Sequence, residues 1–122
     1  MHELQIKVRQ LHGVQIVELA GAIDALAFSS LSATLTRMIQ EGTLFIALDC
    51  VAVTYIGSAQ LKGLLEFASR VRSHGGDLKC VGVAPTIQQV ANLIALGDLL
   101  EFHDDLSDAL QGFRRIRESV AR

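Results

Sequence analysis

The sequence predicts an α/β domain whose mixed, mostly parallel sheet has about five strands and four helices. The first observation behind this prediction is the order of hydrophobic patterns, which alternate along the chain as β-β-α-β-α-β-α-β-α. The second is the segment 44–51, Leu-Phe-Ile-Ala-Leu-Asp-Cys-Val, which is apolar almost throughout. Such a run is typical of a parallel strand that is covered on both faces. The chain has 122 residues and no linker, repeat or low-complexity segment, so we expect a single domain over residues 1–122.

The N-terminal part of the chain predicts a hairpin followed by a helix. Residues 3–9 alternate between polar and apolar, as in a half-exposed strand near a sheet edge, and residues 14–19 return as a second strand after a turn at 11–13. Residues 20–24 then lead into a helix, with Asp24 as its N-cap and Gly42 as its C-terminal stop. The apolar face of this helix consists of Phe28, Leu31, Leu35, Met38 and Ile39.

The central strand at 44–51 leads through a turn at 53–57 into a second helix. Ser58 stands at the N-cap position of this helix, where a hydroxyl can accept a hydrogen bond from an unpaired amide of the first turn. The same position lies at the positive end of the helix dipole, which favours an anion such as phosphate. The pair Gly75–Gly76 ends the helix. Its apolar face consists of Leu61, Leu64, Leu65, Ala68 and Val71.

The last third of the chain predicts two more strand–helix pairs. Residues 77–83 form a strand, and Pro85 occupies the first position of a short helix that Gly97 ends. Residues 99–103 form a last short strand, and Asp105 caps the final helix. The apolar faces of these helices consist of Ile87, Val90, Ala91 and Ile94, and of Leu106, Ala109, Leu110 and Phe113.

Right-handed crossovers make the central strands parallel, and this places three turns at one edge of the sheet. These turns carry Asp24, residues 54–58 and residues 84–86. In open α/β sheets the functional crevice usually lies at that edge. The predicted topology therefore makes Asp24 a neighbour of Ser58.

Composition and charge argue against several classes of function. The net charge of −2 gives no basic field for nucleic acid, and we interpret Arg114, Arg115 and Arg117 as a solvated helix face. No apolar run approaches the length of a membrane span and no secretion leader is recognisable, so the cytoplasm is the default location. Cys50 and Cys80 fall in predicted strands and are interpreted as reduced core residues. We expect no metal and no cofactor, because no residues have ligand spacing and the histidines are scattered: His2, His12, His74 and His103.

The same residues do not favour an enzymatic function. A serine nucleophile on a strand–turn–helix needs Gly-x-Ser-x-Gly, and the flanking positions here are Ile56 and Gln60. No histidine is placed to activate Ser58, and neither a P-loop nor a Gly-x-Gly-x-x-Gly motif is present. We therefore predict that the protein is not an enzyme.

Several segments resemble the STAS domain, the fold of bacterial anti-sigma factor antagonists. Residues 21–24, Gly-Ala-Ile-Asp, are similar to the Gly-x-Leu-Asp before the first helix of that family. Leu48-Asp49 and then residues 54–61, Thr-Tyr-Ile-Gly-Ser-Ala-Gln-Leu, resemble its third strand and the loop that follows. Residues 75–78 resemble the Gly-Gly before its fourth strand, and residues 105–110 resemble the acidic start and Ala-Leu of its last helix. The resemblance covers nearly the whole chain and implies a STAS-like fold.

The resemblance also implies a function in partner switching. In antagonists of this kind, the serine after the loop aspartate is phosphorylated by the anti-sigma factor, itself a serine kinase. The unmodified antagonist binds that kinase, and the phosphorylated form releases it. The matching residue is Ser58, which the residues alone allow to be a helix N-cap, a phosphorylation site or both. The sequence differs from the family pattern at Gly57, where aspartate is expected, at Ala59, where a hydroxyl is expected, and at Gln60, where glycine is expected.

We therefore predict a small regulatory protein that binds an anti-sigma factor serine kinase and is switched by phosphorylation at Ser58. The predicted partner surface consists of Asp24, Thr54, Tyr55, Gly57, Ser58, Gln60, Lys62 and Glu66. One alternative is a STAS scaffold without phosphorylation, as a subunit of a transport ATPase or of a signalling complex, which the altered loop favours. A further alternative is purine nucleotide binding at the same edge. The sequence leaves the oligomeric state open, a homodimer included.

Overall fold

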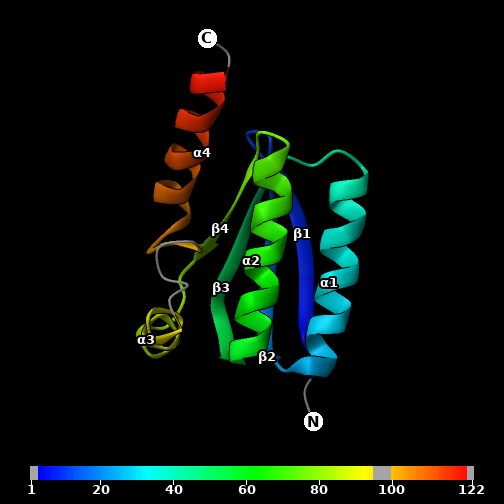
Figure 1. The fold of residues 1–122 in the computed structure, drawn as a ribbon, viewed down its shortest axis with the longest axis vertical. Coiled ribbons are helices and arrows are strands. Elements are labelled where there is room, and N and C mark those ends of the chain that lie inside the picture. The colour runs from blue at the N-terminus through cyan, green and yellow to red at the C-terminus, as the bar shows by residue number, and fades with distance from the viewer. Residues whose placement is uncertain (1–2, 95–99, 121–122) are drawn as a thin grey trace.

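The computed structural model describes residues 3–94 and 100–120, with side chains through residue 118. Its elements follow in the predicted order (Figure 1). Their bounds are β1 Gln5–Leu11, β2 Val14–Ile23, α1 Ala25–Gln40, β3 Phe45–Ile56, α2 Ser58–Ser73, β4 Asp77–Val81, α3 Pro85–Leu93, β5 Glu101–His103 and α4 Leu106–Val120. The strands form one sheet in the order β1-β2-β3-β4-β5, in which β1 and β2 are antiparallel and the other neighbours are parallel. The predicted mixed α/β sheet is confirmed.

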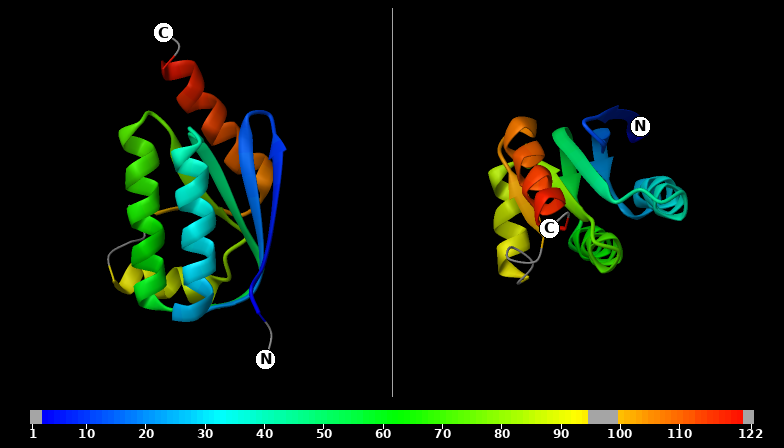
Figure 2. Two further views of the ribbon diagram at one scale, coloured as in Figure 1. Left: turned by 90° about the vertical axis from the view of Figure 1, so that its right-hand side faces the viewer. Right: turned by 90° about the horizontal axis from the view of Figure 1, so that it is seen from above.

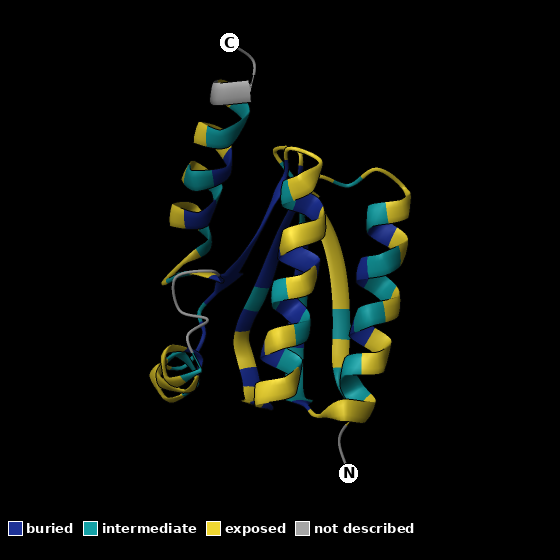
Figure 3. Cartoon of the chain, viewed as in Figure 1, coloured by how far each residue is buried: buried dark blue, intermediate teal, exposed yellow. Residues whose placement is uncertain are grey.

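Helices cover both faces of this sheet. Helices α1 and α2 lie side by side on one face, and α4 crosses the other (Figure 2). The larger apolar core lies under α1, α2 and α3, where Leu31, Leu64 and Ala91 meet the side chains of β2, β3 and β4. The smaller core lies under α4, where Ala109 and Phe113 pack on strand residues such as Phe45. Buried residues therefore gather in β3 and β4, whereas the edge strand β1 is mostly exposed (Figure 3).

Several predicted boundaries were wrong, because strand pairing continues beyond the local pattern. Residues 53–57 were expected to be a turn, but β3 runs on to Ile56 and only Gly57 separates it from α2. Strand β2 likewise runs on to Ile23, because Ala22 and Ile23 pair with Tyr55 and Ile56 after a shift of register. A bulge breaks the simple alternation of side chains, so the sequence pattern looked like a loop.

The remaining differences are smaller. Strand β4 ends at Val81 rather than at residue 83, because Gly82 takes a positive φ of 68°. Phe67 belongs to the buried face of α2 and was not predicted, whereas Val90 of α3 is 38% exposed rather than packed in the core. The predicted stop at Gly97 and the start of the last strand at Leu99 lie outside the described residues.

Glycines end α1 and α2 as predicted. Gly42 and Gly75 have φ angles of 91° and 86°, which is the left-handed conformation of a C-terminal stop. Gly76 also closes the end of α2, since its amide donates to the carbonyl of Val71 at 2.8 Å, and it has a second role, because a Cβ atom there would lie 1.9 Å from the carbonyl oxygen of Leu44. The amide of Asp77 donates to that same carbonyl at 2.9 Å. Gly76 therefore allows the chain to approach the start of β3 closely.

Helix α4 begins at the predicted cap. The Oδ1 atom of Asp105 accepts a hydrogen bond from the amide of Asp108 at 2.8 Å. Arg114 and Arg115 are exposed, as expected. Arg117 is not simply solvated, because its guanidinium lies 5.6 Å from the ring centroid of Phe45. The interpretation of all three arginines as a solvated face is thus correct for two of them.

Candidate functional site

The carboxyl ends of β2 and β3 meet the N-termini of α1 and α2 at one end of the sheet (Figure 1). The amide of Gly57 donates to the carbonyl of Ile23 at 3.3 Å. Each of these two residues immediately precedes a predicted site residue, Ser58 and Asp24 respectively. The topology therefore brings the Asp24 and Ser58 segments side by side, as the sequence predicted.

Asp24 is the N-cap of α1. Its Oδ1 atom accepts a hydrogen bond from the amide of Ala27 at 2.9 Å, and the residue is exposed. This bond satisfies one of the amides that the first turn of a helix leaves unpaired. The second carboxylate oxygen remains available at the surface beside the start of α2.

Ser58 is not the N-cap of α2, contrary to the prediction. The cap is Gly57, whose backbone is extended with φ −71° and ψ 155°, and no side chain caps the helix. Because β3 continues to Ile56, the helix begins directly at Ser58, one residue earlier than a serine cap would require. Ser58 is exposed, and its hydroxyl makes no hydrogen bond within the described part of the chain. The hydroxyl is therefore free to react or to contact a partner at the positive end of the helix.

The side chain of Gln60 occupies the space beside Gly57. A Cβ atom on Gly57 would lie 2.0 Å from the Oε1 atom of Gln60 and 3.3 Å from the Oη atom of Tyr55. Gly57 is buried, as is Ile56 before it, whereas Ser58 after it is exposed. The aspartate that the resemblance predicts at position 57 could enter only if the amide of Gln60 moved away.

The other predicted surface residues surround this point. Thr54 and Tyr55 are exposed at the end of β3, and Lys62 and Glu66 are exposed one turn apart on α2. All the predicted partner residues except Gly57 and the half-buried Gln60 thus present exposed side chains at this end of the sheet or along α2.

Sequence reasoning missed an exposed leucine at this surface. Leu26 in the first turn of α1 is 81% exposed. It lines a cavity of about 470 Å³ together with Glu3, Asp24 and Ser29. The available signal was that Leu26 lies off the apolar face formed by Phe28, Leu31 and Leu35, which leaves a large side chain with no place in the core.

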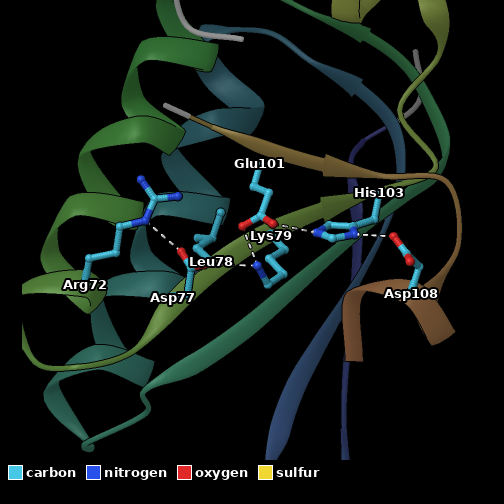
Figure 4. Close-up of polar contacts among 7 residues, drawn as sticks. All are labelled: Arg72, Asp77, Leu78, Lys79, Glu101, His103 and Asp108. Atoms are coloured by element: carbon cyan, nitrogen blue, oxygen red, sulfur yellow. Dashed lines mark hydrogen bonds and ion pairs between the residues drawn. The ribbon is translucent and has the colours of Figure 1, made fainter. Parts of the chain in front are cut away.

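A second polar feature was also missed, the charge cluster at the C-terminal end of α2, between the sheet and α4. It consists of Arg72, Asp77, Lys79, Glu101, His103 and Asp108 (Figure 4). Lys79 is only 2% exposed, and its ammonium group donates to Asp77 at 3.1 Å and to Glu101. Asp77 lies two residues earlier in the same strand, but Glu101 is 22 residues away, so the local sequence did not indicate the cluster.

The cluster extends from Lys79 toward α2 on one side and toward α4 on the other. Arg72 donates to Asp77 Oδ1 at 2.7 Å. The ring nitrogens of His103 lie 2.6 Å from Asp108 Oδ2 and 3.2 Å from Glu101 Oε1. The cluster therefore joins α2, β4, β5 and α4 through charged side chains (Figure 4).

The cluster shifts the acidity of its buried carboxylate. Burial raises the pKa of Asp77, but the hydrogen bonds and positive charges of Arg72 and Lys79 outweigh burial, so its pKa lies below the ordinary value. In the larger apolar core, the Cys50 thiol has a pKa well above its ordinary value, because of a hydrogen bond with Cys80 and because of burial. Both cysteines are free thiols, as predicted.

The described residues contain no group of three or more histidine, cysteine or acidic side chains arranged to hold a metal ion. Among the same residues, no helix is both long and apolar enough to cross a membrane. The surface at this end of the sheet offers the exposed Ser58 hydroxyl, the exposed Tyr55 and, on the neighbouring segment, the Asp24 carboxylate with the exposed Leu26 beside it. Such a surface can bind a partner and accept a modification.

Comparison with solved structures finds the same fold in other proteins. An anti-sigma factor antagonist from Mycobacterium paratuberculosis has a TM-score of 0.82 at 22% identity, covering 92% of this chain and 95% of the other. The Bacillus cell fate determinant SpoIIAA in its phosphorylated form has a TM-score of 0.68 at 16% identity, covering 88% and 97%. A sulfate transporter family protein from Wolinella succinogenes has a TM-score of 0.70 at 25% identity, covering 88% and 90%.

A search of curated proteins finds no match. The model of the STAS domain family, in contrast, matches residues 5–109, which include every strand and the first three helices. This chain therefore belongs to the STAS domain family.

Proposed function

We propose that this chain is a regulatory module of the anti-sigma factor antagonist type, which acts by binding a serine-kinase partner rather than by catalysis. The partner surface would be centred on Ser58 and would include Asp24, Tyr55 and Gln60. The observation that supports this proposal most directly is the exposed Ser58 hydroxyl, which makes no hydrogen bond within the described chain. A kinase needs such a hydroxyl to be accessible.

Phosphorylation at Ser58 would change this surface in two ways. The phosphate would add nearly two negative charges at the first residue of α2, where the helix dipole favours an anion, so the fold itself would tolerate it. In a packed interface the same charge would have to be desolvated, and it would lie near the carboxylate of Asp24. We therefore expect phosphorylation to release the partner without unfolding the module.

Pull-downs from a lysate of the source organism test this proposal. The baits are the wild-type chain, Ser58→Ala, Ser58→Asp and the control Ser69→Asp, which places the same charge at another exposed position on α2. We expect wild type, Ser58→Ala and Ser69→Asp to capture a serine kinase that phosphorylates wild type at Ser58. Ser58→Asp should lose that kinase. Equal capture by all baits, or a captured kinase that modifies other residues only, would refute the switch.

A second candidate function is a scaffold without phosphorylation, within a transporter or a larger assembly. The similarity to the Wolinella sulfate transporter family protein favours it. So does position 57, where the chain has glycine instead of the expected aspartate and the side chain of Gln60 fills the space beside it. This function predicts that the same pull-downs capture one set of transporter or scaffold components with all four baits.

A further inference from the structure

A groove lies between α4 and the turn that joins β1 to β2. It has a volume of about 670 Å³ and is lined by residues of one flank of α4 and by His12 of the turn. This volume is within the range of roughly 300–1,000 Å³ that small-molecule sites occupy in proteins. The groove lies at the opposite end of β2 from Ser58, so it is independent of the surface proposed above.

The lining divides into an apolar end and a basic end. Leu106 and Leu110 provide the apolar part near the start of α4, and Arg114 and Arg117 lie one to two turns further along the helix. His12 adds an imidazole and Gln111 an amide, and none of the described residues that line the groove is acidic, although the chain carries a net charge of −2. The lining therefore complements a molecule with an apolar body and an anionic head.

The guanidinium of Arg117 is held by neighbouring groups that do not neutralise its charge. Its guanidinium lies over the ring of Phe45, with the centroid at 5.6 Å, and a Cβ atom on Gly13 would lie 2.7 Å from its Nη1 atom. No described carboxylate forms an ion pair with it. Arg114 does pair with Glu118 at 3.3 Å, but both side chains are exposed, where such a pair contributes little. The half-buried Arg117 is thus a positioned cation whose charge is not compensated within the described chain.

The backbone at His12 gives an independent observation. His12 has a φ of 52° and is the only residue other than glycine with a positive φ in the described chain. His12 and Gly13 form a two-residue hairpin turn with positive φ at both positions, for which asparagine, aspartate or glycine is preferred. Histidine is among the residues that accept a positive φ, although asparagine, aspartate and glycine are preferred in this turn, and the imidazole of His12 lines the groove.

We propose that this groove binds a small amphiphilic anion, with its carboxylate or phosphate head at Arg117, Arg114 and His12. The short apolar body of the ligand lies along Leu106 and Leu110. Guanidinium groups hydrogen-bond to the oxygen atoms of such a head, and the exposed flanks of the leucines are removed from water by the body.

The test is a titration of the full chain with hexyl phosphate, followed by ¹H–¹⁵N NMR, with inorganic phosphate and hexanol as the separate halves of the probe. We expect saturable shifts confined to the hairpin turn and to the α4 residues 106–117. Neither half alone should bind as tightly as hexyl phosphate. Equal affinity for inorganic phosphate would show only a basic surface, and shifts spread over the whole chain or no shifts at millimolar probe would also overturn the proposal.

Three variants separate binding from folding. His12→Asn introduces a residue that the turn prefers, so it should leave stability unchanged or higher while weakening the binding of hexyl phosphate about threefold to tenfold. Arg114→Gln should weaken it by a similar factor, and Arg115→Gln, an exposed arginine of α4 that does not line the groove, should not. Equal affinity in all three variants would overturn the assignment of the basic end.

Discussion

Replacing Lys79 by methionine tests whether the charge cluster stabilises the fold. Methionine keeps the length and the apolar stem of the side chain but removes the ammonium group. That group lies 3.1 Å from Asp77 Oδ2, contacts Glu101 and lies 5.3 Å from the ring centroid of Phe113. Lys79 also faces α4 closely, since a Cβ atom on Gly112 would lie 2.9 Å from its Cε atom. A smaller residue would also leave a cavity under α4, so its effect on stability could not be assigned to the loss of charge alone.

The magnitude follows from what each carboxylate retains. Asp77 is buried, but it keeps the Arg72 guanidinium at 2.7 Å and the amide of Leu78 at 2.8 Å. The side chain of Glu101 is 46% exposed, so water replaces the lost ammonium group. The cost should therefore be smaller than the roughly 3–5 kcal/mol of leaving a buried charge without a partner. We expect Lys79→Met to lower the free energy of unfolding by about 1–3 kcal/mol.

A double-mutant cycle measured by urea unfolding separates the pair from its surroundings. Asp77→Asn should cost more in wild type than in the Lys79→Met background, with a coupling of about 0.5–3 kcal/mol. The slope of the unfolding free energy against urea should stay the same in all variants. If Lys79→Met is as stable as wild type, or if Asp77→Asn costs the same in both backgrounds, then the buried contacts contribute no net stability and the reasoning is refuted.

Three further predictions use single positions. The lowered pKa of Asp77 gives stability that is complete above the ordinary carboxyl pKa of about 4 and is lost as the pH falls through the lower pKa of the folded state. In Asp77→Asn, the free energy of unfolding measured in urea should therefore fall less steeply at acid pH. Gly76→Ala should lower the free energy of unfolding by about 3 kcal/mol or more, because its Cβ would meet the carbonyl of Leu44. Gly75→Ala should lower it by only about 1–2 kcal/mol, because the space there is open and only the positive φ is unfavourable. Similar thermal unfolding of the two variants would contradict this difference. Asp24→Ala should cost about 1 kcal/mol as a lost helix cap, and Asp24→Ser should recover most of it; equal stability of Asp24→Ala and wild type would show that the cap is unimportant.

The topology was predictable because local patterns and one general rule determine it. Alternating and periodic hydrophobic residues gave the order of elements, and the right-handedness of crossovers gave the parallel strands and the meeting of the Asp24 and Ser58 segments. The helix caps Asp24 and Asp105 were also predictable, as was Pro85 at the first position of α3. In each of these cases the information lies within a few residues of the feature.

Features that depend on distant contacts were not predictable. The extension of β3 to Ile56 depends on pairing with β2 across a bulge, and it moved the start of α2 so that Ser58 lost its expected capping role. Of the partners of Lys79, only Asp77 lies in the same strand; Glu101 comes from β5, 22 residues further along the chain, and Phe113 comes from α4. A single sequence shows a lysine in an apolar strand but cannot show what neutralises it.

The change at positions 57 and 60 illustrates the same limit at the candidate site. Compared residue by residue, the chain has lost an aspartate at position 57 and gained a glutamine at position 60 relative to the pattern that it resembles. In the folded chain the two differences depend on each other, because the Oε1 atom of Gln60 lies where the side chain of residue 57 would begin. An oxygen atom thus stands beside the start of α2 in either arrangement, but here it belongs to a neutral amide rather than to a carboxylate. Restoring only the aspartate would force Gln60 to rotate, so recognition by a kinase can be assigned to the missing charge only when both positions are exchanged together.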